Sequence, residues 1–203
     1  MAKMHFKYAT MNSGKSIDLI RTAYNYEENG FKVVIMKPII DTKAGNKISS
    51  RVGMERTVDF LIEPNSSILE LLKNSTCVNA IFIDESQFLS SKQVDELFIF
   101  SKVFDIPVIC YGLRLNFKGE SFEGSKRLLE VCEELEEIPT LCKCGEIARY
   151  VGRKENDEFV TDGLEVVIDG CKNVEYVPLC GDCFLEKVKK IDYKDIRRNV
   201  SSL

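Results

Sequence analysis

The sequence predicts an open, mostly parallel α/β sheet with helices on both faces, followed by a small cysteine-rich lobe. Short apolar runs typical of buried strands alternate with amphipathic helical patterns as far as residue 135, as in folds built from right-handed strand–helix–strand units. Near the start, a strand leads through a tight turn directly into a helix. Beyond Pro139, paired cysteines, glycines and short β-prone runs replace the alternation.

The elements can be placed along the chain from these patterns. Strands are expected at residues 5–8, 31–36, 58–62, 79–85 and 107–111, and later at 148–151, 164–168 and 175–179. Helices are expected at residues 17–29, 68–73, 92–104 and 125–135. Ser67 with Glu70 and Ser90 with Gln93 form capping boxes that begin two of these helices. The polar stretch 42–56 predicts a long loop or an exposed hairpin.

The change of character near Ile138 predicts a domain boundary. We expect an α/β domain at residues 1–138, a second lobe at 139–190 and a polar tail at 191–203. The chain has 203 residues, which is enough for one sizeable domain with a small appendage.

Composition narrows the classes of function. With 44% hydrophobic and 30% charged residues the chain has the composition of a soluble globular protein, and its net charge of −4 offers no broad basic field for nucleic acid. No apolar run approaches the roughly 20 residues that a membrane span needs. The N-terminus runs into the first strand without an apolar secretory segment, so we expect a cytoplasmic protein without membrane or nucleic-acid partners.

The tight turn after the first strand carries a phosphate-binding pattern. Residues 9–16 read Ala-Thr-Met-Asn-Ser-Gly-Lys-Ser, close to the P-loop pattern GxxxxGK[ST]. In that pattern, backbone N–H groups at a helix start surround phosphate oxygens, the lysine reaches the outer phosphates and the hydroxyl binds magnesium. Ala9 replaces the first glycine, which the turn tolerates if φ at that position is negative.

Carboxylates follow two of the expected strands. Asp84 ends an apolar strand, and because such strand ends lie beside the phosphate loop in a doubly wound sheet, it can complete a magnesium site with Ser16. Glu85 comes next and can accept a proton from an attacking hydroxyl. The alternative is a pair of solvated carboxylates at a strand end. Asp41 alone is more often a turn residue than a metal ligand.

Four of the eight cysteines form two close pairs. Cys142 and Cys144 are separated by one residue, and Cys180 and Cys183 by two, the spacing typical of zinc ribbons. Four thiolates leave zinc no open position, so the site would be structural and would stabilise a lobe too small for a core of its own. Buried or redox-active cysteines are the alternative, and Cys171 is the residue best placed to substitute for one ligand.

Four aromatic residues are expected at strand ends or in loops: Phe88, Phe117, Phe122 and Tyr176. Together they can form a slot for a flat ring, although each alone is more often a packing residue. His5 is the only histidine and lies in the first strand. Acid–base chemistry therefore falls to carboxylates.

These groups of residues occur together in one order: residues 11–16, Lys37-Pro38 with Asp41, residues 84–88, residues 111–113 with Phe117, and the four paired cysteines. The combination resembles the type II thymidine kinases, the cytosolic-type enzymes of bacteria and animals, over about residues 3–187. The resemblance implies transfer of the γ-phosphoryl group of ATP to the 5′-hydroxyl of thymidine or deoxyuridine. The products would be dTMP and ADP, in salvage of nucleosides for DNA synthesis.

The resemblance also implies roles for individual residues. ATP would be bound by Asn12, Ser13, Gly14, Lys15, Ser16, Asp84 and Gln87. Magnesium would be bound by Ser16, Asp84 and Asp41, with Glu85 as the general base. The thymine would be surrounded by Met11, Phe88, Leu113, Phe117, Phe122, Val167 and Tyr176. Structural zinc would be bound by Cys142, Cys144, Cys180 and Cys183.

The segment between the two cysteine pairs resembles the family's lasso loop, whose backbone hydrogen-bonds the base. Such enzymes are usually homotetramers restrained by dTTP. The sequence departs from the family pattern at three places: Ala9 replaces the first loop glycine, Lys43 stands where many members have arginine, and the first cysteine pair is CxC rather than CxxC.

Two other classes share parts of this pattern. A DNA-dependent motor or repair ATPase also combines a phosphate loop, an Asp-Glu strand end and sometimes a zinc ribbon, but the short acidic chain lacks a second basic lobe for a DNA strand. A nucleotide-dependent switch needs neither the Glu85 carboxylate nor an aromatic acceptor slot. The kinase interpretation accounts for both features.

Overall fold

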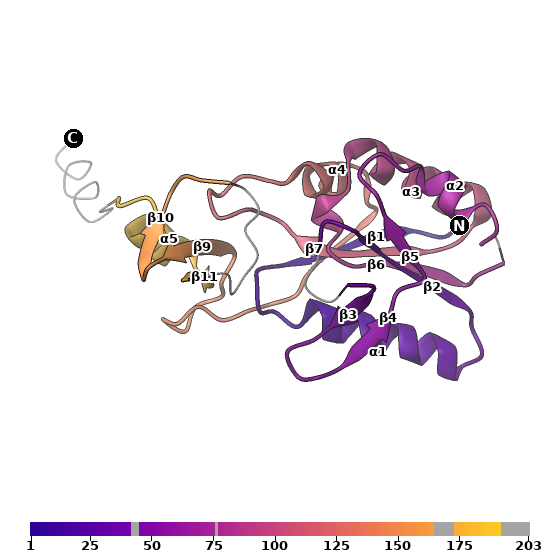
Figure 1. The fold of residues 1–203 in the computed structure, drawn as a ribbon, viewed down its shortest axis with the longest axis horizontal. Helices are drawn as coiled ribbons and strands as arrows, with labels where there is room; N and C mark the ends of the chain where they lie inside the picture. The colour runs from indigo at the N-terminus through magenta and orange to yellow at the C-terminus, as the bar shows by residue number, and fades with distance from the viewer. Residues whose placement is uncertain (42–44, 76, 165–172, 192–203) are drawn as a thin grey trace. The chain divides into compact units, whose positions relative to one another are not determined.

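The computed structural model describes residues 1–41, 45–75, 77–164 and 173–191, which form two compact units. The first consists of Met1–Ala9, Gly14–Arg114 and Ser121–Ile138. The second consists of Thr10–Ser13, Leu115–Glu120 and the chain from Pro139 onward. Figure 1 labels most elements of both units.

A parallel sheet forms the centre of the first unit. Its strands, in the order β5-β2-β6-β7-β1-β8, are Phe60–Ile62, Val33–Pro38, Ala80–Ile83, Val108–Leu113, Met4–Ala9 and Glu134–Glu137. Every neighbouring pair in this sheet is parallel. All residues of β6 and β7 are buried, as expected for central strands covered on both faces. The predicted open parallel sheet is therefore confirmed.

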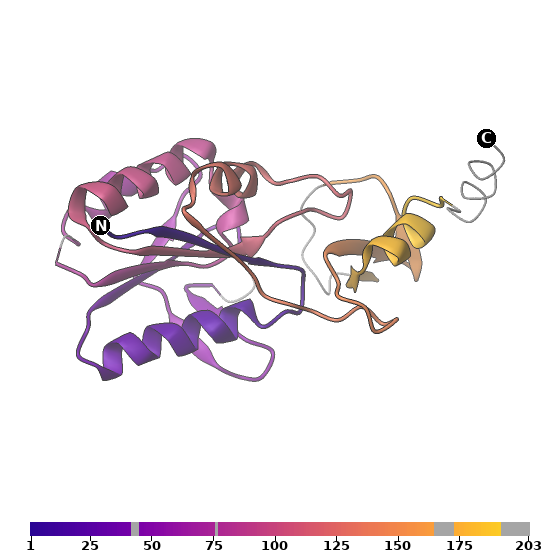
Figure 2. The same cartoon turned by 180° about the vertical axis from the view of Figure 1, so that it is seen from behind.

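Helices cover both faces of this sheet (Figures 1 and 2). Helix α1, Lys15–Glu28, lies on one face, and α2, Ile68–Leu72, α3, Ser91–Phe104, and α4, Glu123–Val131, lie on the other. Residues of β6 alternate between the two cores: Phe82 packs with Leu19 of α1, whereas Ile83 packs with Leu97 of α3. The strand period of two residues thus separates two apolar layers.

The end of the first unit differs from the prediction. A helix was expected at residues 125–135, but α4 ends at Val131 and Glu134–Glu137 forms the edge strand β8 beside β1. This glutamate-rich stretch is paired with cations in β1 and directly before it. Lys7 Nζ lies 3.1 Å from Glu136 Oε2, and Lys3 pairs with Glu134. Because an edge strand tolerates exposed charge, its helix-like sequence was misleading.

The predicted capping box is complete at α3 and half formed at α2. The Ser90–Gln93 capping box of α3 is complete. At α2, the Ser67 side chain accepts from the Glu70 N–H, and the carboxylate of Glu96 from α3 accepts a second hydrogen bond, from the Ile68 N–H at 2.6 Å. In the polar stretch 42–56, the strands β3, Lys47–Ser49, and β4, Glu55–Thr57, form the hairpin alternative.

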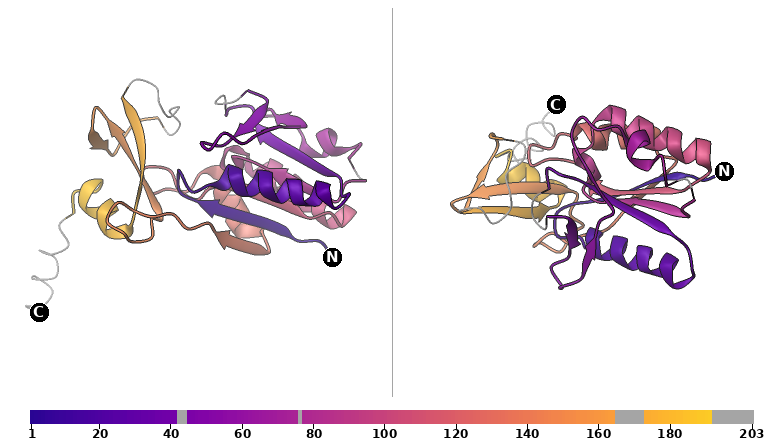
Figure 3. Two further views of the ribbon diagram at one scale, coloured as in Figure 1. Left: turned by 90° about the horizontal axis from the view of Figure 1, so that it is seen from below. Right: turned by 45° about the vertical axis from the view of Figure 1, so that its right-hand side comes forward.

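In the second unit, residues beyond Pro139 form a small antiparallel sheet with the order β10-β9-β11 (Figure 3). Strands β9, Tyr150–Glu155, and β11, Val174–Leu179, overlap two predicted strands, whereas β10, Glu158–Val160, was not predicted. The strand expected at residues 164–168 lies outside the described residues apart from Leu164, which belongs to no strand. Helix α5, Gly181–Lys187, completes the lobe. In the described part of the chain, no helix is long and apolar enough to span a membrane.

Candidate functional site

The backbone before α1 has the bends that a phosphate loop requires. Gly14, at the N-cap of α1, has a φ of +83°, and Asn12 has a φ of +64°. Left-handed residues in such a turn direct successive N–H groups toward a bound anion. Ala9 ends β1 and is not among the residues with positive φ. Its methyl group is therefore compatible with the turn, and the missing glycine carries no backbone strain.

The first turn of α1 meets the end of β6. Lys15 is 7% exposed and Asp84 is 3% exposed. The Ser16 hydroxyl donates to Asp84 Oδ2 at 3.5 Å. The structure thus brings together the serine and the aspartate that the sequence assigned to one site. A hydroxyl and a carboxylate are oxygen donors of the kind that Mg²⁺ prefers.

Asp84 occupies an environment short of positive charge. Burial is the main cause that raises its pKa to about 7, and the negative charge of Glu85 adds to this shift. Lys15 acts in the opposite direction by favouring the ionised carboxylate. A cation bound here would compensate for the buried negative charge, so the donor set fits a magnesium ion held with a polyphosphate.

Asp41, expected near the magnesium, is held by a lysine to which the sequence analysis gave no separate role. Lys37 is fully buried, and its ammonium donates to Asp41 Oδ2 at 2.9 Å and to the Lys47 carbonyl oxygen at 3.0 Å. The negative charge of Asp41 contributes to the raised pKa of Asp84. The available signal was a lysine at the end of an apolar strand, where a buried charge needs a partner.

Glu85 follows Asp84 at a sharp bend. Its φ is +48°, and its N–H donates to Asp84 Oδ1 at 3.0 Å. The bend ends β6 and begins the short 3₁₀ helix η1, Ser86–Phe88. A left-handed conformation in a residue with a Cβ costs about 1–2 kcal/mol. Strain of this kind persists where the neighbouring structure fixes it, and it accumulates at functional sites.

The residues expected around the thymine are distributed over both units. Phe88 and Phe122 lie in the first unit and contact each other edge-on, with ring centroids 5.8 Å apart at 83°. Leu113, at the end of β7, is also in the first unit. Met11, Phe117 and Tyr176 belong to the second unit, Tyr176 within β11 rather than beyond a strand end. Val167 lies outside the described residues.

Arg153 of β9 is a buried residue that the sequence analysis missed. Its guanidinium carbon lies 3.9 Å from the centroid of the Phe117 ring. The same group donates to the carbonyl oxygens of Leu164 at 2.6 Å and Asp162 at 3.0 Å, and pairs with Glu155 at 2.9 Å. One arginine in a strand gives no signal by itself, because the ring that it covers, Phe117, comes from a separate part of the sequence.

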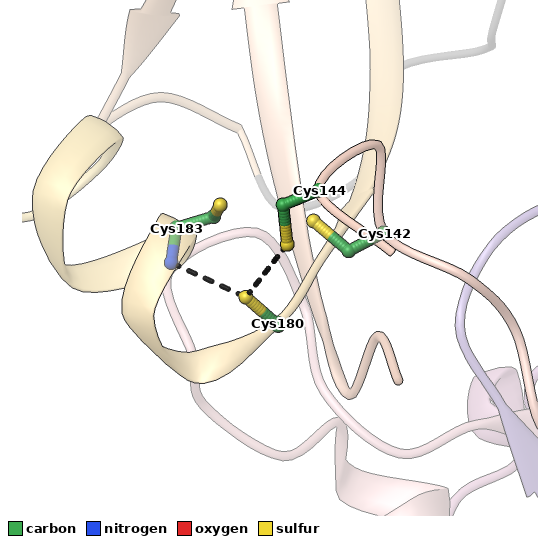
Figure 4. A group of neighbouring side chains, drawn as sticks. All are labelled: Cys142, Cys144, Cys180 and Cys183. Atoms are coloured by element: carbon green, nitrogen blue, oxygen red, sulfur yellow. Dashed lines mark hydrogen bonds between the residues drawn. The ribbon is translucent and has the colours of Figure 1, made fainter. Parts of the chain in front are cut away.

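The four predicted cysteines form one cluster (Figure 4). Their sulfur atoms all lie within 4.8 Å of one another, and Cys144 Sγ is 3.6 Å from Cys180 Sγ. Sulfurs on a tetrahedral zinc lie about 3.8 Å apart, because each Zn–S bond is about 2.3 Å long. The cluster can therefore hold a metal ion with a geometry that suits zinc.

Local turns place these thiols. Gly145, with a φ of +96°, turns the chain after the CxC pair, and its N–H donates to the Cys142 carbonyl oxygen. Cys180 is the N-cap of α5 and accepts from the Cys183 N–H at 3.5 Å. Burial acts to raise the pKa of the Cys142 thiol, but hydrogen bonds from the backbone of Cys144 and Cys180 and from the thiols of Cys144 and Cys183 together lower that pKa to about 6. Cys171 lies outside the described residues.

A parallel α/β sheet with a P-loop turn, a serine hydrogen-bonded to a buried aspartate and a four-cysteine lobe defines a nucleotide-dependent phosphoryl-transfer protein. A family model described as thymidine kinase matches residues 2–184. The chain belongs to the thymidine kinase family, and it is therefore an ATP-dependent nucleoside kinase whose acceptor is thymidine.

Relatives with the printed name thymidine kinase match nearly the whole chain. The protein of Rhodopirellula baltica is 41% identical over 93% of this chain and 90% of its own length. That of Streptococcus gordonii is 42% identical over 89% of this chain and 94% of its own length. Among solved structures, a replication initiator DnaA bound to AMPPCP and single-stranded DNA covers 68% of this chain and 40% of its own, with 18% identity and a TM-score of 0.41, too low to indicate a shared function.

The buried carboxyl of Asp84 predicts an unusual dependence of stability on pH. Between its ordinary pKa of 3.8 and about 7, the folded state binds a proton that the unfolded state has released, so this group lowers stability as pH rises through that window. Without magnesium or nucleotide, Asp84→Asn should raise the free energy of unfolding at pH 8 by about 2–4 kcal/mol.

The advantage of Asp84→Asn should shrink toward pH 4, measured by urea denaturation across that range. Asp157→Asn, at an exposed position, is the control and should change stability little at any pH. A variant that is less stable than wild type at pH 8 would contradict the raised pKa.

Proposed function

We propose that this kinase transfers the γ-phosphoryl group of magnesium-ATP to the 5′-hydroxyl of thymidine, and also of deoxyuridine, through the residues assigned above. The products are dTMP and ADP. The observation that supports this assignment most is the contact of Ser16 with Asp84 at the start of α1. Phosphoryl transfer chiefly requires positioning and charge neutralisation, which this site is built to supply.

The nucleotide occupies the loop between β1 and α1. The N–H groups of residues 12–16 surround the phosphates and Lys15 neutralises the outer ones. Asp84, directly after β6, completes the ATP side of the site, and Gln87, in η1, is the other residue of this segment that was expected at ATP. Ser16, Asp84 and Asp41 hold the magnesium, which when bound would neutralise charge that develops on the phosphate oxygens.

Glu85 is the general base. It accepts the proton of the 5′-hydroxyl as that oxygen attacks phosphorus. Because Glu85 has a positive φ, its side chain does not follow the alternating directions of the side chains in β6. No histidine is required for this step. Exclusion of water by closure over the acceptor would suppress hydrolysis of ATP.

The thymine lies among apolar and aromatic side chains. Its proposed surroundings are Met11, Phe88, Leu113, Phe117, Phe122, Val167 and Tyr176. The edge-on contact of Phe88 with Phe122 supports one wall of this slot. The backbone of the lasso segment between the cysteine pairs would supply hydrogen bonds to the base.

The organisation of the whole protein follows the same proposal. Residues 1–138 form the ATP-binding domain, 139–190 the zinc-binding lobe with the lasso, and 191–203 a polar tail. Cys142, Cys144, Cys180 and Cys183 bind one structural zinc ion, supported by their mutual distances. The enzyme acts in the cytoplasm as a homotetramer and is inhibited by dTTP.

Replacement of the base tests the proposed chemistry. Glu85→Gln keeps the shape of the side chain but cannot accept the proton, so kcat should fall by about 10²–10⁴-fold while the Kd for ATP stays within about twofold. Turnover is measured as thymidine-dependent ADP release and ATP affinity by calorimetry. Glu70→Gln, on the exposed face of α2, is the control and should keep full activity. Unchanged turnover in Glu85→Gln would place the base elsewhere.

Removal of one thiol tests the metal site. Cys180→Ser should reduce zinc from about one ion per chain to a small fraction, because tetrahedral structural zinc needs all four ligands. Metal content is measured by mass spectrometry after dialysis, alongside the thermal unfolding of the chain. Cys77→Ser, at an exposed cysteine, should retain the metal. Full zinc content in Cys180→Ser would point to another ligand, with Cys171 the first to examine.

A further inference from the structure

The side chain of Gln87, one of the residues expected at ATP, is engaged at both ends within the protein. It lies in η1, two residues after Glu85, and is only 2% exposed. Its Oε1 accepts from the Leu113 N–H at 3.0 Å. Its Nε2 donates to Glu85 Oε2 at 2.5 Å. The amide thus links the end of β7 to the proposed base.

The donors and acceptors fix the orientation of this amide. A backbone N–H can only donate, so the Leu113 N–H requires the amide oxygen of Gln87 on the β7 side. The NH₂ group therefore faces Glu85, where it meets an acceptor that is ionised when it acts as a base. Hydrogen bonds to a charged partner are stronger than those between neutral groups. A rotated amide would place like groups against each other at both ends.

The surrounding backbone is shaped around this side chain. Gly112 in β7 lies so close to η1 that an added Cβ would be 2.9 Å from Gln87 Oε1 and 2.7 Å from Ser86 Oγ. The Ser86 hydroxyl donates to the Tyr111 carbonyl oxygen at 2.9 Å. Glycine at position 112 therefore allows η1 to lie directly against the end of β7, which leaves the Gln87 amide little room to move.

A glutamate at the bend after β6 needs such support to act as a base. Glu85 is only partly buried, and its side chain has three rotatable bonds. The Gln87 amide binds one carboxylate oxygen, Oε2, and leaves Oε1 available to receive a proton. A displacement of about 1 Å at a reacting group can lower the rate by about 10²-fold.

We propose that Gln87 is a positioning residue that holds the carboxylate of Glu85 toward the acceptor hydroxyl, and that its side chain does not bind ATP. This inference rests on the proposed role of Glu85 as the base. If Gln87 positions Glu85, a Gln87 variant should lose activity through a lower kcat. If the Gln87 side chain bound ATP, the variant should instead show a higher KM for ATP.

Gln87→Met keeps a buried side chain of similar length and removes both hydrogen bonds. Its kcat should fall by about 10–100-fold, with KM for ATP and for thymidine within about twofold of wild type. A rise in KM for ATP with kcat preserved would overturn the proposal. Gln87→Glu keeps the shape and the acceptor for Leu113 but replaces the donor with an acid next to Glu85, and its kcat should fall at least as far. Full activity in Gln87→Glu would also overturn the proposal.

Gln93→Met is the matched control for the loss of a buried glutamine. Gln93 is 3% exposed and donates to the carbonyl oxygens of Glu63 and Ser66 at 2.9 and 3.0 Å. Its amide therefore holds the chain before α2 and makes none of these bonds to Glu85. Its replacement should lower the thermal stability while kcat stays within about twofold. If Gln93→Met reduced kcat as much as Gln87→Met, the effect would be general destabilisation and the proposal would fail.

A double-mutant cycle tests the link between the two residues. If Gln87 acts through Glu85, adding Gln87→Met to Glu85→Gln should reduce kcat by less than about twofold further. If the fold-reductions in kcat of the two single variants multiplied in the double variant, the link would be refuted. A wild-type enzyme without thymidine-dependent ADP release, or a fully active Glu85→Gln, would instead refute the proposed function itself. Dependence on Glu85 together with an unaffected Gln87→Met would refute only the positioning role.

Discussion

The proposed nucleotide site of this protein depends on the placement of Asp84, a nearly fully buried carboxylate, beside the first turn of α1. Strands β1 and β6 flank β7 and run parallel, so their carboxyl ends reach the same edge of the sheet. The turn after β1 brings Ser16 to Asp84. Burial is the main cause that raises the pKa of Asp84 to about 7, and the negative charges of Glu85 and Asp41 add to the shift. A bound cation such as magnesium would offset the negative charge of these carboxylates.

The end of β7 organises the acceptor side in a similar way. Its backbone accepts from Ser86, donates to Gln87 and accepts from Ser125. The contacts of Ser86 and Gln87 anchor η1 directly after the strained bend at Glu85, and the contact of Ser125 anchors the start of α4. The strand ends thus hold both the carboxylate proposed to bind magnesium and the proposed base, while the pairing of Lys37 with Asp41 restrains a third acidic group. A site of this kind gains precision from the sheet rather than from its loops.

Much of this could be read from the sequence because the signals are local. The phosphate loop, the strand ending in Asp84 and the paired cysteines each depend on nearby residues, and the φ of Ala9 agreed with the condition set for it. Features that depend on distant partners were missed. The sequence of β8 has a helical pattern, and only its ion pairs with Lys3 and Lys7 show why it forms a strand. The position of Arg153 could not be predicted without its contact with Phe117. The orientation of the Gln87 amide could be assigned only from the position of the Leu113 N–H in β7.

The most direct test of the whole account is ADP release by the purified protein with magnesium-ATP against thymidine, deoxyuridine, deoxycytidine, deoxyadenosine and single-stranded DNA. Release driven by thymidine, and by deoxyuridine, with the nucleoside monophosphate formed in equal amount, is the predicted result. Release that no nucleoside stimulates and single-stranded DNA does would contradict the account. The phosphate loop and the cysteine lobe would then belong to a DNA-dependent ATPase.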